Sequence, residues 1–252
     1  MHPSSPPSST PSSSAPPGPS SSRRAVTAGA ISFLAVLVLI VGGTLGVRAA
    51  IGGGTRDADP ALFTQKPTAD CTTPSGSGDD SDSSGSTVRG GHLRFTRPDG
   101  WDYPWETRTL PYMTSVNGYA RQVEDTWYST VNVGSVEWPA SEGKYPGDED
   151  AAVTIFQCYV NTTGLVEDFG ENPSTTDRRS ERTTVDGHDA WIVQATYHFE
   201  DSSPLKATSA SIVTSIVVST DDGPQALAAD VAADIPEHAD GLDRIIRSLE
   251  LV

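Results

Sequence analysis

A run of 23 residues without a charged side chain constrains this chain more than any other feature. It covers residues 25–47 and reads AVTAGAISFLAVLVLIVGGTLGV. As an α-helix rising about 1.5 Å per residue it would be roughly 34 Å long, and the hydrocarbon core of a bilayer is about 30 Å thick. Arg23 and Arg24 precede the run, and Arg48 follows it. The run therefore predicts one transmembrane helix.

The same run could be a cleaved signal peptide, with residues 47–49 as the cleavage motif and the arginine pair as part of a twin-arginine signal. Its length favours an uncleaved anchor, because signal-peptide cores usually have about 7–15 apolar residues. No cysteine follows that could carry a lipid. Positive flanking charge is retained on the cytoplasmic side. The chain is therefore predicted to be a single-pass protein of the cell membrane, with its N-terminus in the cytoplasm.

Composition divides the rest of the chain. Residues 1–24 are mostly Ser and Pro, which cannot bury enough apolar surface to offset the entropy of ordering. They are predicted to form a disordered cytoplasmic tail. Residues 48–90 are rich in Gly, Ser and Asp and are predicted to form a flexible acidic stalk. Residues 91–252 remain as one extracytoplasmic domain, an ordinary size for a single core.

Charge excludes one class of partner. Apart from Arg23 and Arg24, all charged residues follow residue 47, where 15 Lys and Arg face 33 Asp and Glu, a net charge of −18. Such a field repels nucleic acids and anionic lipid headgroups. Arg178, Arg179 and Arg182 form the one basic cluster, and their spacing favours a solvated strand face over a phosphate site. No nucleic-acid partner is expected.

The two cysteines, Cys71 and Cys158, lack the spacing of a zinc site. An isolated pair in an oxidising compartment is expected to join. The predicted disulfide would link the stalk to the domain. The alternative is a buried free Cys158 and an unpaired Cys71.

Residue patterns predict an α+β domain. Strands are expected where β-branched and apolar residues alternate with polar ones, namely around Leu93 and Phe95 and over residues 129–138 and 207–220. Residues 147–161 have helical apolar spacing with Asp148 as a candidate N-cap, although their β-branched residues would also suit a strand. Residues 240–252 predict a terminal helix capped by Asp240. Hairpin-ordered strands with helices on one or both faces make an antiparallel sheet sandwiched by helices.

The segment TTVDGHDAWIVQATYHF, residues 183–199, brings two histidines near two carboxylates and could suggest an acid–base or metal site. Asp186–Gly187 between two extended runs is, however, a strong signal of a two-residue hairpin turn. His188 and His198 would then lie roughly 33 Å apart along one strand. The segment therefore predicts a hairpin, with no metal or cofactor bound there.

The segments GGHLRFTRPDGW, AAVTIFQC, TTVDGHDAWIV and LDRIIRSLEL follow one another in this order. With them, residues 90–252 resemble a group of actinobacterial membrane-anchored envelope proteins that are similar to LpqN-type lipoproteins. The resemblance implies a PsbP-like fold, an antiparallel sheet sandwiched by helices. The lipobox cysteine of those lipoproteins is absent here, and the transmembrane helix would serve instead. The fold is not tied to a catalytic residue set, so no active site is implied.

Aromatic residues are dense between residues 101 and 145, where four of the five tryptophans lie. Stacked on an outer face, they would suit binding of a glycan or a lipid tail; otherwise they fill the core of a small sheet. The candidate ligand-binding side chains are Trp101, Trp105, Trp127 and Trp138.

No sequence motif of a hydrolase, zinc protease, nucleotide site or EF-hand is present. The sequence therefore favours a non-catalytic module that binds a ligand or an envelope protein at the membrane surface. The alternative is an envelope hydrolase whose active site cannot be recognised from local motifs.

Overall fold

The computed structural model describes residues 58–74, 82–105, 110–162 and 165–252. The predicted tail and transmembrane helix lie outside the described residues, so both remain predictions. Within the described ranges, no helix has the length and apolar character needed to cross a membrane.

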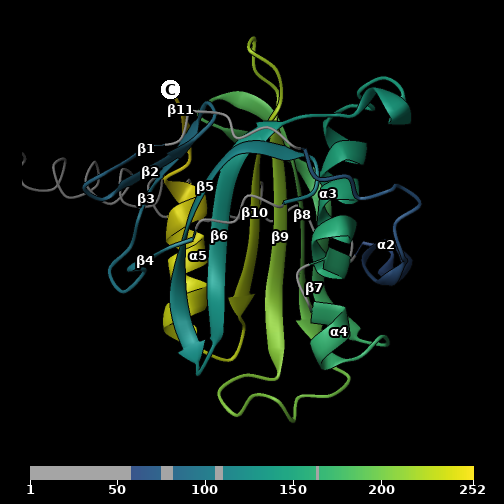
Figure 1. Ribbon diagram of the computed structural model, residues 1–252, viewed down its shortest axis with the longest axis vertical. Coiled ribbons are helices and arrows are strands. Elements are labelled where there is room, and N and C mark those ends of the chain that lie inside the picture. Colours follow the sequence, from purple (N-terminus) through teal and green to yellow (C-terminus); the bar gives the residue numbers. More distant parts are fainter. Residues whose placement is uncertain (1–57, 75–81, 106–109, 163–164) are drawn as a thin grey trace, which may run out of the picture. The chain divides into compact units, whose positions relative to one another are not determined.

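A seven-stranded antiparallel sheet forms the centre of the described part of the chain (Figure 1). From one edge to the other its strands are β4 (Tyr103–Pro104), β5 (Met113–Glu124), β6 (Trp127–Val136), β10 (Gln225–Ala232), β9 (Ala210–Val218), β8 (His188–His198) and β7 (Ser174–Val185). A smaller antiparallel sheet has the order β1 (Asp82–Ser84), β2 (Thr87–Gly90), β3 (Leu93–Thr96) and β11 (Glu250–Leu251).

Helices cover both faces of the large sheet. On one face, α3 (Asp148–Thr162) packs with α2 (Pro60–Thr64) and α4 (Leu165–Phe169); on the other, α5 (Pro236–Arg247) packs together with β3 (Figure 1). The short 3-10 helix η1 (Ala140–Glu142) precedes α3. The predicted α+β class, an antiparallel sheet sandwiched by helices, is confirmed.

Alternation along β8 separates the two cores. Val193 belongs to the core under α3, whereas its neighbour Ile192 belongs to the core under α5. Successive side chains of a strand point to opposite faces, so a strand covered on both faces is buried along its whole length. β10 shows the result, because all eight of its residues are buried.

The prediction of a flexible stalk over residues 48–90 is wrong for the two described segments, residues 58–74 and 82–90. Phe63 of α2 is 1 % exposed and meets the Phe156 ring edge-on at 5.4 Å. The backbone carbonyl of Leu62 accepts a hydrogen bond from the Gln157 side chain at 2.8 Å. Val88 of β2 is equally buried. The apolar residues among the polar ones are few, yet they are sufficient to dock these segments on the domain.

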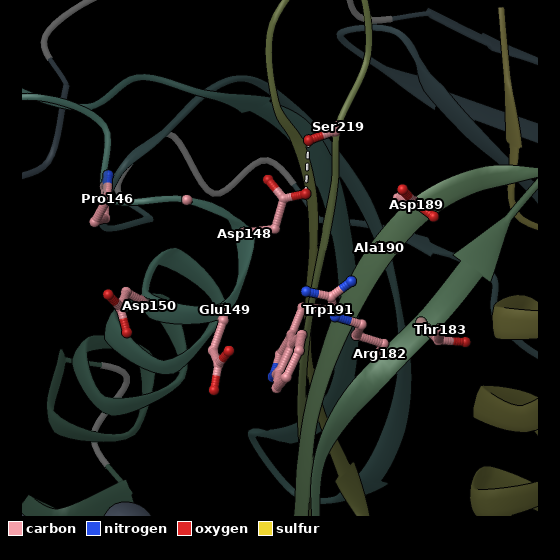
Figure 2. A pocket seen from close by; sticks show the side chains of 11 residues that line it. Pro146, Asp148, Glu149, Asp150, Arg182, Thr183, Asp189, Ala190, Trp191 and Ser219 are labelled. Carbon is pink, nitrogen blue, oxygen red and sulfur yellow. Dashed lines mark hydrogen bonds between the residues drawn. The ribbon is translucent and has the colours of Figure 1, made fainter.

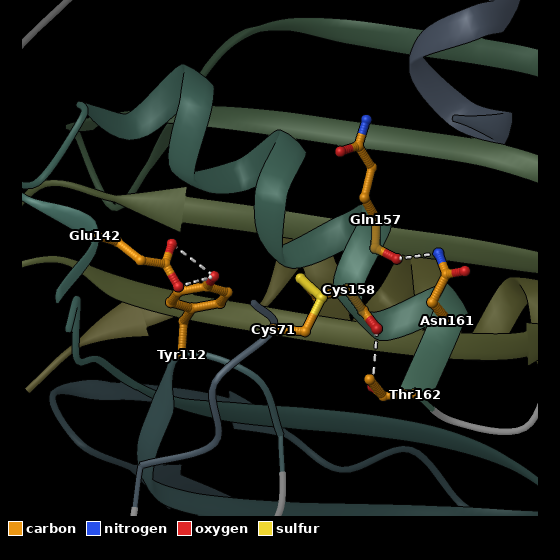
Figure 3. Close-up of a disulfide and its surroundings, with 7 residues drawn as sticks. All are labelled: Cys71, Tyr112, Glu142, Gln157, Cys158, Asn161 and Thr162. Atoms are coloured by element: carbon orange, nitrogen blue, oxygen red, sulfur yellow. Dashed lines mark hydrogen bonds between the residues drawn. A yellow bond between two sulfur atoms is a disulfide. The ribbon is translucent and has the colours of Figure 1, made fainter. Parts of the chain in front are cut away.

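The disulfide between Cys71 and Cys158 is confirmed, with Cα atoms 5.3 Å apart. It joins the segment after α2 to the C-terminal half of α3 (Figure 3). The alternative of two free thiols is therefore wrong.

The terminal helix begins earlier than predicted. Pro236 occupies its first turn, where a proline removes no intrahelical hydrogen bond. Asp240 lies inside the helix and is not its cap. After the helix, Glu250 and Leu251 pair with β3 as the short strand β11, which the helical spacing of the sequence does not reveal.

Candidate functional site

The hairpin prediction for residues 183–199 is confirmed. Asp186 and Gly187 have φ angles of 51° and 82°, and Val185 pairs with His188. The two histidines lie at the two ends of β8. The described residues contain no cluster of three or more potential metal ligands. The Asp186 carboxylate has a further contact, because it accepts a hydrogen bond from the backbone N–H of Leu251 at 3.2 Å.

The four candidate tryptophans do not form one surface. Trp101 is fully buried under α5, where Gly241 lets the helix approach the indole, since a Cβ there would lie 2.5 Å from its Nε1. The predicted binding role therefore does not hold for Trp101. The other three are partly exposed, and each contacts another aromatic ring: Trp105 with Tyr128, Trp127 with Phe169, and Trp138 with Tyr112.

One buried pair has the chemistry of a hydrolase. The Ser129 hydroxyl lies 2.8 Å from Nδ1 of His238. However, Ser129 is fully buried and accepts a hydrogen bond from the backbone N–H of Ala232 at 2.9 Å. Burial, aided by the nearby charge of Arg121, lowers the pKa of His238 to about 4. A substrate cannot reach this hydroxyl in the described structure, so the pair is a structural contact of the core.

A polar cleft lies where α3 begins, against the strands β7, β8 and the end of β9 (Figure 2). Its volume is about 370 Å³. Trp191 and Arg182 lie on the strand side, Asp148 and Glu149 lie across from them at the start of the helix, and Asp150 lies farther from the strands (Figure 2). Further lining comes from Pro146, Gly147, Thr183, Asp189, Ala190 and Ser219.

Hydrogen bonds hold two walls of this cleft in place. The Asp148 carboxylate accepts from the Tyr145 hydroxyl at 2.7 Å and from the Ser219 hydroxyl at 2.6 Å. Burial and the bond to Asp148 raise the pKa of Tyr145 well above its usual value, so Tyr145 remains a donor. On the other side, the Trp191 indole N–H donates to the Ser180 hydroxyl at 2.9 Å.

A second, shallower cleft of about 360 Å³ adjoins the first, because Pro146 and Asp150 line both. Its other lining residues are Thr68, Ala69, Asp70, Trp138, Glu142 and Thr154. We call the two clefts together the Trp191–Trp138 groove. The two clefts lie on either side of the start of α3, and the second reaches the segment that the disulfide fixes.

The wall beside the disulfide is also ordered by hydrogen bonds. The hydroxyl of the buried Tyr112 donates to the Glu142 carboxylate at 2.7 and 2.8 Å (Figure 3). Burial and Glu142 raise the pKa of Tyr112 well above its usual value. The backbone N–H of Tyr112 donates to the carbonyl of Thr72, next to Cys71, at 3.0 Å.

Sequence patterns did not identify this groove. The sequence predicts Trp191 on a strand of the hairpin and Asp148 at the start of a helix, with no indication that the two lie together. The groove forms only when α3, the strand β8 and the segment before Cys71 come together, and these are far apart in the chain. Its one local signal is Trp191 directly opposite Arg182 in the hairpin register.

No family model and no curated protein matches this chain. The solved structures that are similar to it include the following two. The crystal structure of LpqN, involved in cell envelope biogenesis of Mycobacterium tuberculosis, is 16% identical with a TM-score of 0.35, over 64% of this chain and 83% of that chain. The solution structure of cyanobacterial PsbP from Synechocystis sp. PCC 6803 is 14% identical with a TM-score of 0.39, over 64% and 87%. The similarity is distant, and membership in a family is not shown.

Proposed function

We propose that this protein is a non-catalytic binding module of the cell envelope, anchored in the membrane by residues 25–47, with its folded domain outside. The Trp191–Trp138 groove is its binding site. The observation that carries the proposal is the pair of adjoining clefts, of about 370 and 360 Å³, each with a tryptophan in its wall. Cavities of this size that combine an aromatic surface with converging polar groups are typical of ligand sites.

The disulfide supports the extracytoplasmic placement, because disulfides persist in oxidising compartments and are rare in the cytosol. The acidic composition supports a protein or small-molecule ligand over a nucleic acid. The burial of Ser129 weighs against an envelope hydrolase that would use the Ser129–His238 pair as nucleophile and base.

The proposal is tested by capture from cell-envelope extract. The full-length protein in a non-ionic detergent is immobilised and incubated with cell-wall fragments and solubilised envelope proteins, and mass spectrometry identifies what is retained. We expect specific material that the Trp191→Ala protein no longer retains. A matched control is Trp105→Ala, which truncates a partly exposed tryptophan outside the groove. Retention that is unaffected by Trp191→Ala, or reduced equally by both changes, would refute the groove as the site.

A further inference from the structure

We infer that the ligand of the Trp191–Trp138 groove is an extended basic segment of a polypeptide. The inference rests on the proposed function and specifies the partner of the same site. It follows from three features of the groove: the origin of its carboxylates, the aromatic surface of Trp191, and the presence of one guanidinium among the acids.

Six carboxylates line the groove, and they come from four separate parts of the chain. Three are in the first turn of α3, one is on β8, one is on η1 and one precedes the disulfide: Asp148, Glu149, Asp150, Asp189, Glu142 and Asp70. Acidic residues in a first helical turn are commonly there to stabilise the helix dipole. That explanation covers the three residues of α3 but not the other three. Folding brings the latter to the groove from elsewhere.

Most of these carboxylates have no side-chain partner in the part of the chain that the structure describes. Asp148 and Glu142 accept the hydroxyl hydrogen bonds described above. Among the described residues, the side chains of Asp70, Glu149, Asp150 and Asp189 take part in no hydrogen bond or ion pair, and all four are exposed. Arg182 is the only cation in the lining of the two clefts. A cleft lined by one sign of charge concentrates ligands of the opposite sign.

Trp191 adds a contact that a cation can use. Its ring is partly exposed in the first cleft, and its N–H is held by Ser180. Tryptophan is the most favourable aromatic partner of a Lys or Arg head group. The apolar stems of these side chains also cover aromatic surface while their charge stays in water. A basic side chain placed over Trp191 would therefore have carboxylates of Glu149 and Asp189 within the same cleft.

The guanidinium of Arg182 distinguishes between classes of cationic ligand. Arg182 is exposed and forms no ion pair among the described residues, so its N–H donors bind water in the free protein and can bind an acceptor on a ligand that fills the first cleft. Backbone carbonyls of a peptide provide acceptors alongside basic side chains. A polyamine has cations but no such acceptor, and a neutral glycan gains nothing from the net charge of the groove. Two adjoining clefts also suit an extended chain.

The test is a titration of the full-length protein, in non-ionic detergent at 0.15 M salt, with a fluorescent octalysine peptide. Two double variants remove the same charge in different places. Glu149→Gln/Asp150→Asn alters exposed carboxylates in the groove, whereas Glu167→Gln/Asp168→Asn alters exposed carboxylates on α4. The same peptide with every lysine acetylated keeps the backbone and loses the charge. Maltoheptaose serves as the neutral glycan.

We expect at least a tenfold rise in Kd for the groove variant and less than a twofold rise for the α4 variant. Trp191→Ala should also weaken binding, and the acetylated peptide should not bind. Equal losses in the two double variants, or equal affinity for the acetylated peptide, would overturn the inference. The inference would also be overturned if the protein bound maltoheptaose, or bound none of the probes, while it still captured envelope material in a way that depends on Trp191. In that case the proposed function would stand. If Trp191→Ala leaves the capture of envelope material unchanged, both the inference and the proposed function are contradicted.

Discussion

At the scale of single residues, Asp230 is a buried group whose ionisation is coupled to folding. It lies on β10, its carboxyl accepts a hydrogen bond from the Ser211 hydroxyl, and burial raises its pKa from 3.8 to about 7. Between these pH values the unfolded chain has released the proton and the folded chain retains it. The contribution of Asp230 to the free energy of unfolding therefore falls as pH rises through this window, and is constant above it.

Asp230→Asn removes this ionisation. At pH 8 we expect the variant to be more stable than the wild type by on the order of 2–4 kcal/mol, and at pH 4 the two should differ little. Because the pKa of His238 is lowered in the folded chain, its contribution to the free energy of unfolding rises with pH between 4 and 6.5. The quantity to measure by urea denaturation is therefore the difference in the free energy of unfolding between the variant and the wild type, in which the contribution of His238 cancels. A variant without added stability at pH 8 would show that folding does not raise the pKa of Asp230.

Gly187 tests the hairpin turn. Its φ of 82° is unfavourable for a β-branched residue, and a Cβ there would meet no atom within 4 Å, so only backbone strain should matter. We expect Gly187→Val to lower the free energy of unfolding by about 1–3 kcal/mol. His188→Ala, at the neighbouring exposed position, should cost less than about 1 kcal/mol. Denaturation of both variants checks this, and an equally stable Gly187→Val protein would contradict it.

At the scale of elements, the disulfide fixes the segment after α2 on α3. It closes a loop of 87 residues, for which the chain-entropy model gives about 4.6 kcal/mol before any strain is subtracted. Replacing both Cys71 and Cys158 by Ala should lower the free energy of unfolding by roughly 3–4.5 kcal/mol. The exported wild-type chain should react with no alkylating reagent unless it is first reduced, as mass analysis would show. Two reactive thiols without reductant would mean that the bridge does not form in the cell.

Elements with a strong local signal could be predicted from the sequence, and the others could not. The Asp186–Gly187 turn and the apolar spacing of α3 are visible locally. β10 reads QALAADVA and is buried on both faces, so it shows no alternation. The docking of α2 depends mainly on Phe63 meeting Phe156, a contact between residues far apart in the chain. For the same reason the groove could not be assembled from sequence motifs.

At the scale of the whole molecule, the topology is the prediction on which the cellular role depends. A reporter enzyme that is active only after export, fused after Val252, should be active. If the 23-residue apolar run is retained as an anchor, as proposed, the purified chain should begin near Met1. N-terminal sequencing that instead found Ala50 or Ile51 first would show that the run is a cleaved signal peptide.

The central claim, that the Trp191–Trp138 groove receives a partner in the cell envelope, is tested most directly by crosslinking in living cells. A photoreactive amino acid is introduced at Glu149, in the groove, and separately at Glu167, an exposed position on α4. After illumination, adducts are identified by mass spectrometry. The account predicts a specific adduct from position 149 that is lost when Trp191→Ala is added, and none from position 167. Adducts from position 167 alone, the same adducts from both positions, or no adduct from position 149 would contradict it.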